Sequence, residues 1–233
     1  MGANEMIKSG CTVLGVFAII TAACMPAHSF SLGFSAVGGL GVGYYSMSEL
    51  NSHISTKRQD LGITLDELTS GINFRLEGRV WVMDFAGVAG GYEYFWGETS
   101  SEGTSTSITF RTPADVYTVG AIVPIIRIKN AFDVCLGANW CFAKAVFEMK
   151  EETDVSRIIP GFKGDDSGFE AYAEAQTKFF NPIEIGFQLG YRGIKISSLT
   201  SVKDGSEATF ADGTKVEIDY SGAFFSLTAA IRL

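Results

Sequence analysis

The most regular feature of the chain is an alternation of apolar and polar residues with a period of two. It is clearest over residues 216–233, where apolar residues occupy every second position and polar or small residues lie between them. Such a period places the apolar side chains on one face of a β-strand. The apolar face of this predicted terminal strand consists of Phe225, Leu227, Ala229, Ile231 and Leu233.

Seven earlier segments have the same two-faced pattern. They span residues 31–46, 72–84, 90–99, 107–126, 131–149, 169–179 and 184–197. The connections between them alternate in length. Those at 84–89, 127–130 and 181–183 are short, whereas 47–71, 100–106, 150–168 and 198–214 are mostly long and polar. Short turns at one end and long loops at the other are typical of outer-membrane barrels.

The composition of the two faces indicates which face points outward. The polar face combines charged residues with glycines, and the apolar face has aromatic residues near the segment ends, as in the aromatic girdles of membrane barrels. The chain is therefore predicted to be all-β, with residues 30–233 forming an eight-stranded antiparallel up-and-down transmembrane β-barrel. The alternative is a secreted soluble barrel with its apolar face inside, which explains the alternation but not the sorted loops.

The first 29 residues have the features of a secretory signal peptide. Lys8 precedes an apolar run over residues 11–25, and cleavage after Ser29 would leave Ala27 at the minus-three position. Two alternatives stay open, a lipoprotein signal centred on Cys24 and a simple membrane anchor. The predicted domains are thus a signal peptide, 1–29, and a barrel, 30–233.

Bulk composition excludes some classes of function. The formal net charge of -8 argues against a nucleic-acid partner, which requires a basic surface. Cys135 and Cys141 lie six residues apart in one predicted strand, about 20 Å, too far for a mutual disulfide. His53 is the single histidine after the predicted signal peptide. We therefore predict no catalytic residues, no metal site and no cofactor.

The predicted interior contains charges of both signs. It consists of Arg75, Glu77, Arg79, Glu93, Glu170, Glu174, Lys178 and Arg192. The expected turns place Glu93 diagonal to Arg79 and Arg192 beside Glu170. Because unpaired buried charges are costly, one interpretation is a paired plug, and the other is a water-filled path for small solutes.

Three further features of the sequence have two interpretations each. Gly39, Gly41 and Gly43 either leave the lumen open or make room for Trp81, Phe95 or Tyr172. Pro113 and Pro124, which lack a ladder donor, either lie outside the bilayer and beside a turn or mark a lateral gap in the wall. Thr64 and Glu67 resemble a capping box, so residues 57–68 could form a short helix.

These patterns resemble the small eight-stranded outer-membrane proteins, the group of OmpX, the OmpA transmembrane domain and OmpW. The resemblance covers residues 30–233 and rests on strand number, loop sorting, the Asn181-Pro182-Ile183 turn and the terminal strand. Leu233 departs from the terminal Phe that is usual in this group, which puts recognition by the assembly machinery in doubt.

The resemblance implies an outer-membrane location, with long loops extracellular and both termini periplasmic. It implies membrane lipid, barrel-assembly machinery and periplasmic chaperones as partners. It also implies a non-enzymatic role, the passage of small molecules, including hydrophobic ones, as in OmpW-like proteins. The alternative is a surface-exposed adhesion or envelope protein whose long loops contact host surface molecules.

Overall fold

The structure is a computed structural model, and it describes residues 31–61, 64–83, 85–102, 107–128, 131–152, 157–158, 161–210 and 213–232. The predicted signal peptide and Leu233 lie outside the described residues. Within the described part, no helix has the length and apolar character needed to cross a membrane.

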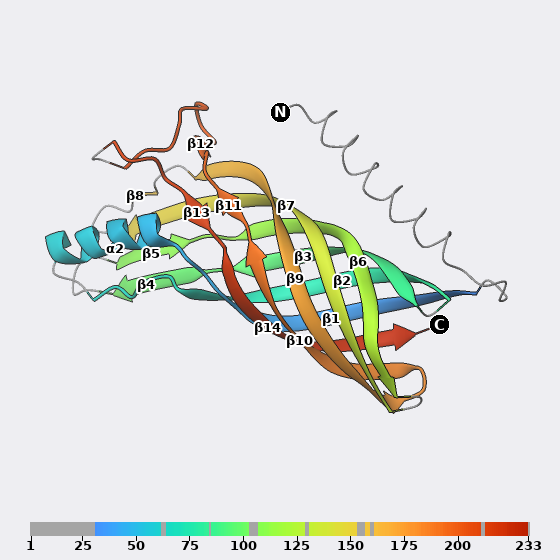
Figure 1. The fold of residues 1–233 in the computed structure, drawn as a ribbon. Helices are drawn as coiled ribbons and strands as arrows, with labels where there is room; N and C mark the ends of the chain where they lie inside the picture. Colours follow the sequence, from blue (N-terminus) through green and yellow to red (C-terminus); the bar gives the residue numbers. More distant parts are fainter. Residues whose placement is uncertain are drawn as a thin grey trace. The chain divides into compact units, whose positions relative to one another are not determined.

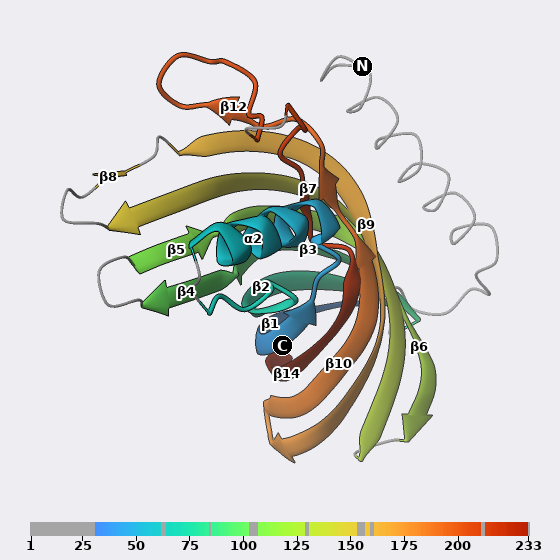
Figure 2. The ribbon, with the colours of Figure 1, turned by 90° about the vertical axis from the view of Figure 1, so that its left-hand side faces the viewer.

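Eight long strands form a closed antiparallel ring (Figures 1 and 2). Each strand pairs with the next along the chain, and the last pairs with the first, Leu40 opposite Leu227. The predicted fold class is therefore confirmed. The ring consists of β1 (Leu32–Tyr44), β2 (Ser70–Val82), β3 (Ala86–Trp96), β6 (Ala114–Ile128), β7 (Phe132–Glu152), β9 (Phe162–Phe180), β10 (Ile183–Gly193) and β14 (Gly222–Arg232).

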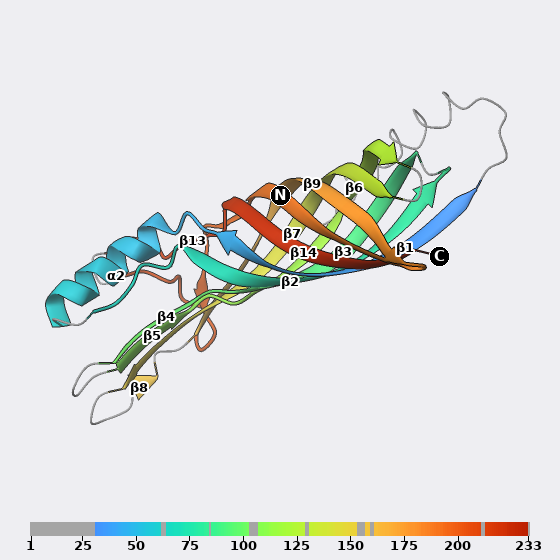
Figure 3. The same cartoon turned by 90° about the horizontal axis from the view of Figure 1, so that it is seen from below.

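The shorter elements gather at the end of the ring that has the long connections (Figures 1 and 3). They are α2 (Ser48–Leu61), β4 (Glu98–Glu102), β5 (Ser107–Arg111), β8 (Arg157–Ile158), β11 (Lys195–Ile196), β12 (Thr200–Ser201) and β13 (Ile218–Asp219). We call this group of elements, with their connecting segments, the cap. The first residue of β1 and the last of β14 lie at the opposite end, with the short turns.

Several predicted strands are interrupted where they pass from the ring into the cap. The predicted strand 107–126 is two strands, β5 and β6, separated by Thr112 and Pro113. Proline cannot donate to a ladder, so a strand break is a common place for it. Predicted strand 90–99 divides at Gly97, and the terminal strand divides before Gly222, where a Cβ would overlap the backbone carbonyl of Tyr44.

The predicted helix over 57–68 is correct only for residues 57–61, because α2 begins earlier, at Ser48, and ends at Leu61. Met47, Leu50 and Ile54 follow a three- and four-residue spacing, and all three side chains are buried. That spacing gives α2 one apolar face. The segment containing Thr64 and Glu67 is not helical, and its Leu65 and Leu68 are buried against the same cluster.

Apolar side chains point outward around the ring. In β14, Phe225 and Leu227 are 42% and 63% exposed, whereas Ser226 and Thr228 between them are 0% and 5% exposed. Ala229 and Ile231 also point outward. A soluble barrel would have the reverse arrangement, so the soluble alternative is wrong.

The outward apolar belt ends at a sharp boundary towards the cap. In β7, outward Phe142 is followed by outward Lys144, and in β6 outward Tyr117 is preceded by Asp115. Beyond this boundary the inward positions become apolar, as Val116 and Phe147 show. Aromatic residues mark the cap side of the belt: Tyr44, Trp96, Tyr117, Phe142, Phe169 and Tyr191.

Candidate functional site in the barrel lumen

The ring brings seven of the eight predicted interior charges together in the lumen. Each side chain is at most 4% exposed: Arg75, Glu77, Arg79, Glu93, Glu170, Glu174 and Arg192. The prediction was wrong for Lys178, which is exposed and does not belong to the buried set. It lies beside a register shift near the end of β9, opposite Glu184, where the interior opens at the short-turn rim.

Arg79 forms the ion pairs nearer the short-turn end. Its Nη1 and Nη2 donate to the two carboxylate oxygens of Glu174 at 2.7 and 2.5 Å, and its Nε donates to Glu77 at 2.6 Å. The guanidinium and carboxylate are therefore matched in a bidentate pair across the lumen, from β2 to β9. Bidentate charged hydrogen bonds of this kind are short, strong and geometrically specific.

Arg75 links three other strands on the cap side of Arg79. Its Nε donates to Glu93 of β3 at 2.8 Å, its Nη2 to Glu170 of β9, and its Nη1 to Gln188 of β10 at 2.9 Å. A fork of fixed donors can hold several acceptors at once. Arg75 therefore connects strands that are not neighbours in the ring.

Arg192 lies between two aromatic rings. The centre of its guanidinium is 4.1 Å from the Phe95 ring centroid and 4.5 Å from the Phe224 centroid. Its Nη2 lies 3.5 Å from Glu93 and 3.4 Å from Glu170. Cation–π attraction and the two carboxylates both favour this buried charge. Its Nε and Nη1 have no hydrogen-bond partner among the described residues.

One predicted register is confirmed and one is wrong. Arg192 is directly opposite Glu170, as expected. Glu93 is opposite Arg75 and not diagonal to Arg79, because the β2–β3 turn closes earlier than expected, with Val82 opposite Ala86.

Three amides complete the network and were missing from the predicted site. Asn73 donates to Glu93 at 3.3 Å, Asn139 donates to Glu170 at 3.2 Å, and Gln188 donates to Glu174. They supply donors to a network whose four glutamates outnumber its three arginines. All three lie on the inward face of their strands, so the period-two pattern could have identified them.

An alternating row of glycines and large side chains fills the lumen across the ring. Directly paired residues along the row are Gly33, Trp81, Gly87, Ile122, Gly137, Tyr172, Gly190, Phe224 and Gly43. The row returns to β1 ten residues beyond its start, and this stagger is the shear of the barrel. Trp81, Ile122, Tyr172 and Phe224 pack together with Cys135. Small and large residues thus interleave to close the interior.

The glycines of β1 make room for other side chains than expected. A Cβ on Gly41 would overlap Ser226, a Cβ on Gly43 would lie 2.8 Å from the Tyr45 ring, and Gly39 faces Thr228. Space for Tyr172 comes from Gly137 on β7. The interpretation that the β1 glycines accommodate Trp81, Phe95 or Tyr172 is therefore wrong.

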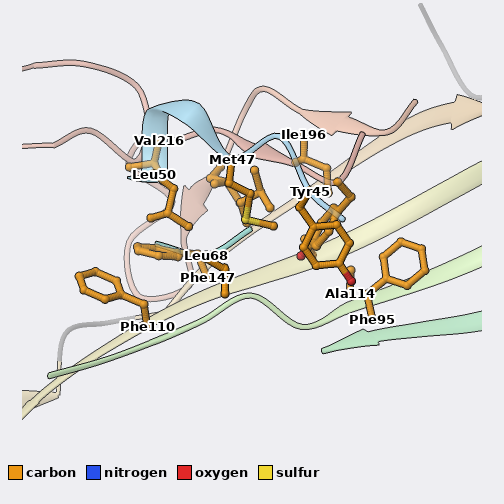
Figure 4. Close-up of a cluster of buried hydrophobic side chains, with 14 of the residues drawn as sticks. Tyr45, Met47, Leu50, Leu68, Phe95, Phe110, Ala114, Phe147, Ile196 and Val216 are labelled. Atoms are coloured by element: carbon orange, nitrogen blue, oxygen red, sulfur yellow. The ribbon is translucent and has the colours of Figure 1, made fainter. Parts of the chain in front are cut away.

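The cap covers the lumen with an apolar cluster (Figure 4). Leu50 and Met47 lie on one side of it, and Phe110 and Phe147 from β5 and β7 lie on the other. The side chain of Asn51 connects α2 to the backbone of Leu68, in the segment after the helix, through two hydrogen bonds. Its Oδ1 accepts from the Leu68 amide at 2.7 Å, and its Nδ2 donates to the Leu68 carbonyl at 3.2 Å.

Two tyrosines, Tyr45 and Tyr220, belong to the apolar cap cluster. Tyr220 donates to the Thr112 carbonyl at 2.7 Å, and its ring lies edge-on to Tyr45, with centroids 5.3 Å apart. Burial raises the pKa of Tyr45 to about 12, and burial raises the pKa of Tyr220 well above its usual value. Burial thus disfavours the charged phenolate form of both side chains.

The wall is continuous at the predicted lateral gap. Pro124 lies two residues beyond Ile122, the last residue of β6 that pairs with β3, so its missing N–H interrupts no bond between these strands. On the β7 side, Pro124 is paired with Cys135 and is followed by a register shift. Pro113 lies in the cap, where its carbonyl accepts from the Val146 amide at 3.0 Å.

Comparisons with known proteins identify the fold. No protein-family model and no curated protein matched the sequence. Among solved structures, a major outer membrane protein of Thermus thermophilus aligns with a TM-score of 0.51 at 10% identity, over 87% of this chain and 100% of that one. OprG of Pseudomonas aeruginosa (TM-score 0.46, 12% identity, 86% and 95% covered) and Ail of Yersinia pestis (0.43, 13%, 87% and 98%) also match.

The ring, the outward apolar belt and the polar lumen define an eight-stranded transmembrane β-barrel. The resemblance to the small outer-membrane barrels is confirmed at the level of the fold. Since one fold supports many functions, the role of the protein must be argued from the lumen and the cap.

Proposed function

We propose that the chain is an integral outer-membrane barrel without catalytic activity, whose lumen is closed and whose cap contacts other molecules. The observation that carries this proposal is the filling of the interior by three sets of side chains. The alternating glycine row crosses the ion-pair network, where Tyr172 and Phe224 lie against Arg75, and the apolar cap cluster covers the lumen at the cap end. An eight-stranded barrel is only wide enough for its side chains to fill it.

The proposed orientation places the cap outside the cell and the short turns in the periplasm. Long loops at the outer surface and short periplasmic turns are the usual arrangement in such barrels. The first residue of β1 and the last residue of β14 then lie on the periplasmic side. Loops held on a rigid scaffold are suitable contact surfaces, so host surface molecules are the proposed partners of the cap.

Assembly has its own proposed partners, periplasmic chaperones and the barrel-assembly machinery. The segment proposed for recognition is the outward face of β14, with Phe225, Leu227, Ala229 and Ile231. Leu233, its last predicted member, lies outside the described residues. Replacing Phe225 with serine should then slow assembly more than replacing the inward-facing Ala230 with serine.

Reconstitution in liposomes tests the closed lumen. We expect the folded protein to show no single-channel conductance and no uptake of small sugars or amino acids. Folding is verified first by the change in gel migration between unboiled and boiled samples. Measurable solute flux through correctly folded protein would support the passage of small molecules instead.

A loop replacement tests the contact role of the cap. Replacing residues 47–69 with a short Gly-Ser linker removes α2 and leaves the ring strands intact. We expect the loss of binding to host-cell surface molecules, with the gel-migration shift retained. Binding that survives this replacement, together with a matched replacement of 198–214, would contradict a role for the cap.

A further inference from the structure

The buried charges of the lumen do not balance. Within the described part of the ring, the network holds four glutamates and three arginines, each at most 4% exposed. Glu184 is also buried, but it lies at the short-turn rim, opposite Lys178 and outside the network. An uncompensated charge in a low-dielectric interior is costly. The network therefore requires one more positive charge than its side chains supply.

The half of the network on the cap side is balanced. Arg75 contacts Glu93 through Nε at 2.8 Å and Glu170 through Nη2. The Nη2 of Arg192 lies 3.5 and 3.4 Å from the same two carboxylates. Two arginines thus face two glutamates here. The excess negative charge lies in the other half of the network, around Arg79.

Glu174 and Glu77 share Arg79 unequally. Both oxygens of Glu174 accept from the Nη atoms of Arg79, and Gln188 donates to one of them as well. Glu77 receives only the Nε bond, at 2.6 Å to its Oε1. Its Oε2 has no hydrogen-bond partner among the described residues and lies 4.0 Å from the Nη1 of Arg75. Glu77 is therefore the carboxyl group that the arginines compensate least.

A second buried polar group without a partner lies near Glu77. The Tyr172 hydroxyl of β9 is buried and has no hydrogen-bond partner among the described residues. Of the charged groups around this phenol, Glu77 interacts with it most strongly, and Arg79, Arg75 and Glu174 are the others. A phenol oxygen can accept a hydrogen bond from a neutral carboxylic acid. A proton on Glu77 would therefore give both groups a partner.

We propose that Glu77 holds the missing positive charge as a bound proton, so that the network contains one neutral carboxylic acid at neutral pH. The proton is on Oε2 and is donated towards the Tyr172 hydroxyl, while Oε1 still accepts from Arg79. Three carboxylates then face three guanidinium groups. This inference goes beyond the closed lumen and the cap contacts proposed above, because it concerns the charge state of the network, and its failure would leave both of them standing.

A proton fits this place better than a sodium or potassium ion does. An alkali ion requires several oxygen ligands, whereas the residues paired with Glu77 on the two neighbouring strands are Val37 and Gly91, which supply no side-chain oxygen. A metal ion would also have a like-charged neighbour, because Arg79 is bonded to the same carboxyl group. A proton needs only one acceptor oxygen and adds no volume.

The pH dependence of stability tests the bound proton. A glutamate of the unfolded chain is ionised above about pH 4.3, so the chain takes up one proton when it folds at neutral pH. Stability must then fall as the pH rises, and this site should lower the folded-to-unfolded ratio by up to about tenfold per pH unit. Urea unfolding of the full-length protein in lipid vesicles, at about pH 6, 7 and 8, measures this ratio.

Glu77→Gln keeps the shape of the neutral acid and needs no proton. We expect this variant to be at least as stable as the wild type at neutral pH, with an advantage that grows as the pH rises. Glu98→Gln is the matched control, because it removes an exposed carboxylate of the cap that is paired with Arg111. It should leave the pH dependence of the wild type unchanged. Equal pH dependence in the wild type and in Glu77→Gln would overturn the proposal.

Infrared spectroscopy distinguishes a proton from a metal ion. The folded wild type should show the C=O band of a protonated carboxylic acid, and Glu77→Gln should lack it. Tyr172→Phe should shift this band to higher frequency, because the acid loses its hydrogen-bond acceptor. Absence of the band from the wild type would overturn the proposal. Stability that then depended on sodium at constant ionic strength would assign the charge to an alkali ion instead.

Two further variants locate the proton within the network. Glu174→Gln and Glu170→Gln each remove one negative charge, so charge balance alone predicts the same effect as Glu77→Gln. We expect both to lower the folded-to-unfolded ratio by at least about tenfold, because each breaks a charged hydrogen bond to an arginine. If either is as stable as Glu77→Gln, that residue holds the proton, and the assignment to Glu77 is overturned.

Discussion

Gly137 of β7 lies directly opposite Tyr172 of β9, and any side chain at Gly137 would overlap the tyrosine ring. We therefore expect Gly137→Ala to destabilise the barrel by about 1–3 kcal/mol, as overpacking of a filled interior does. Urea unfolding in lipid vesicles measures this change. Adding Tyr172→Leu should recover most of the loss, and a double variant no more stable than Gly137→Ala would contradict the steric explanation.

Arg79 provides the second prediction. Its replacement by alanine leaves Glu174 and Glu77 buried without their shared partner. The loss of one member of a buried ion pair typically costs about 3–5 kcal/mol. We expect a loss of this size in urea unfolding.

Lys178→Ala is the control for Arg79→Ala. It removes a positive charge from the same predicted set, but at the exposed rim, where the contribution of an ion pair is about 0–1 kcal/mol. If both variants unfold at the same urea concentration, the buried network does not stabilise the barrel. A new conductance in Arg79→Ala would show in addition that the network closes the lumen.

The ring and the two faces of each strand could be predicted because both depend only on the period-two alternation. The register could not. Glu93 faces Arg75 instead of lying diagonal to Arg79 because the β2–β3 turn closes at Val82 and Ala86. A register shift by an even number of residues leaves every side chain on its own face, so the alternation contains no information about it.

The cap was harder to predict, although the sequence contains a signal for its boundary. Along β7, most apolar residues occupy even positions up to Phe142, whereas Ala143, Ala145 and Phe147 occupy odd positions, with Val146 as the exception. Along predicted strand 107–126, the phase changes between Val116 and Tyr117. Such a change marks where the surroundings of the wall turn from lipid to water. Which loop segments cover the mouth depends on long-range packing that no local pattern reveals.

Asn51 provides a test of the cap. Its side chain makes both hydrogen bonds to the backbone of Leu68, so Asn51→Ala leaves that amide and carbonyl without these partners. We expect α2 to detach more often, at a cost of about 1–3 kcal/mol. Limited proteolysis of intact vesicles should then cut within residues 47–71 faster, while the gel-migration shift is unchanged.

The control for Asn51→Ala is Thr56→Ala on the same helix. Thr56 is exposed, and its hydroxyl donates only to the Ser52 carbonyl within α2. Its replacement should not change the cleavage rate. Equal acceleration in both variants would mean that general helix stability, and not the contact with Leu68, holds the cap in place.

The three tryptophans test the outward belt directly. Trp140 and Trp96 are 52% and 39% exposed on the outer wall, whereas Trp81 is 3% exposed inside the lumen. In variants that keep a single tryptophan, with the others changed to phenylalanine, brominated lipids should quench Trp140 and Trp96 strongly and Trp81 weakly. Trp96 lies at the aromatic boundary, so bromines near the head group should quench it most, and bromines deeper in the chains should favour Trp140. Strong quenching of Trp81 with weak quenching of Trp140 would mean that the faces of the barrel are reversed.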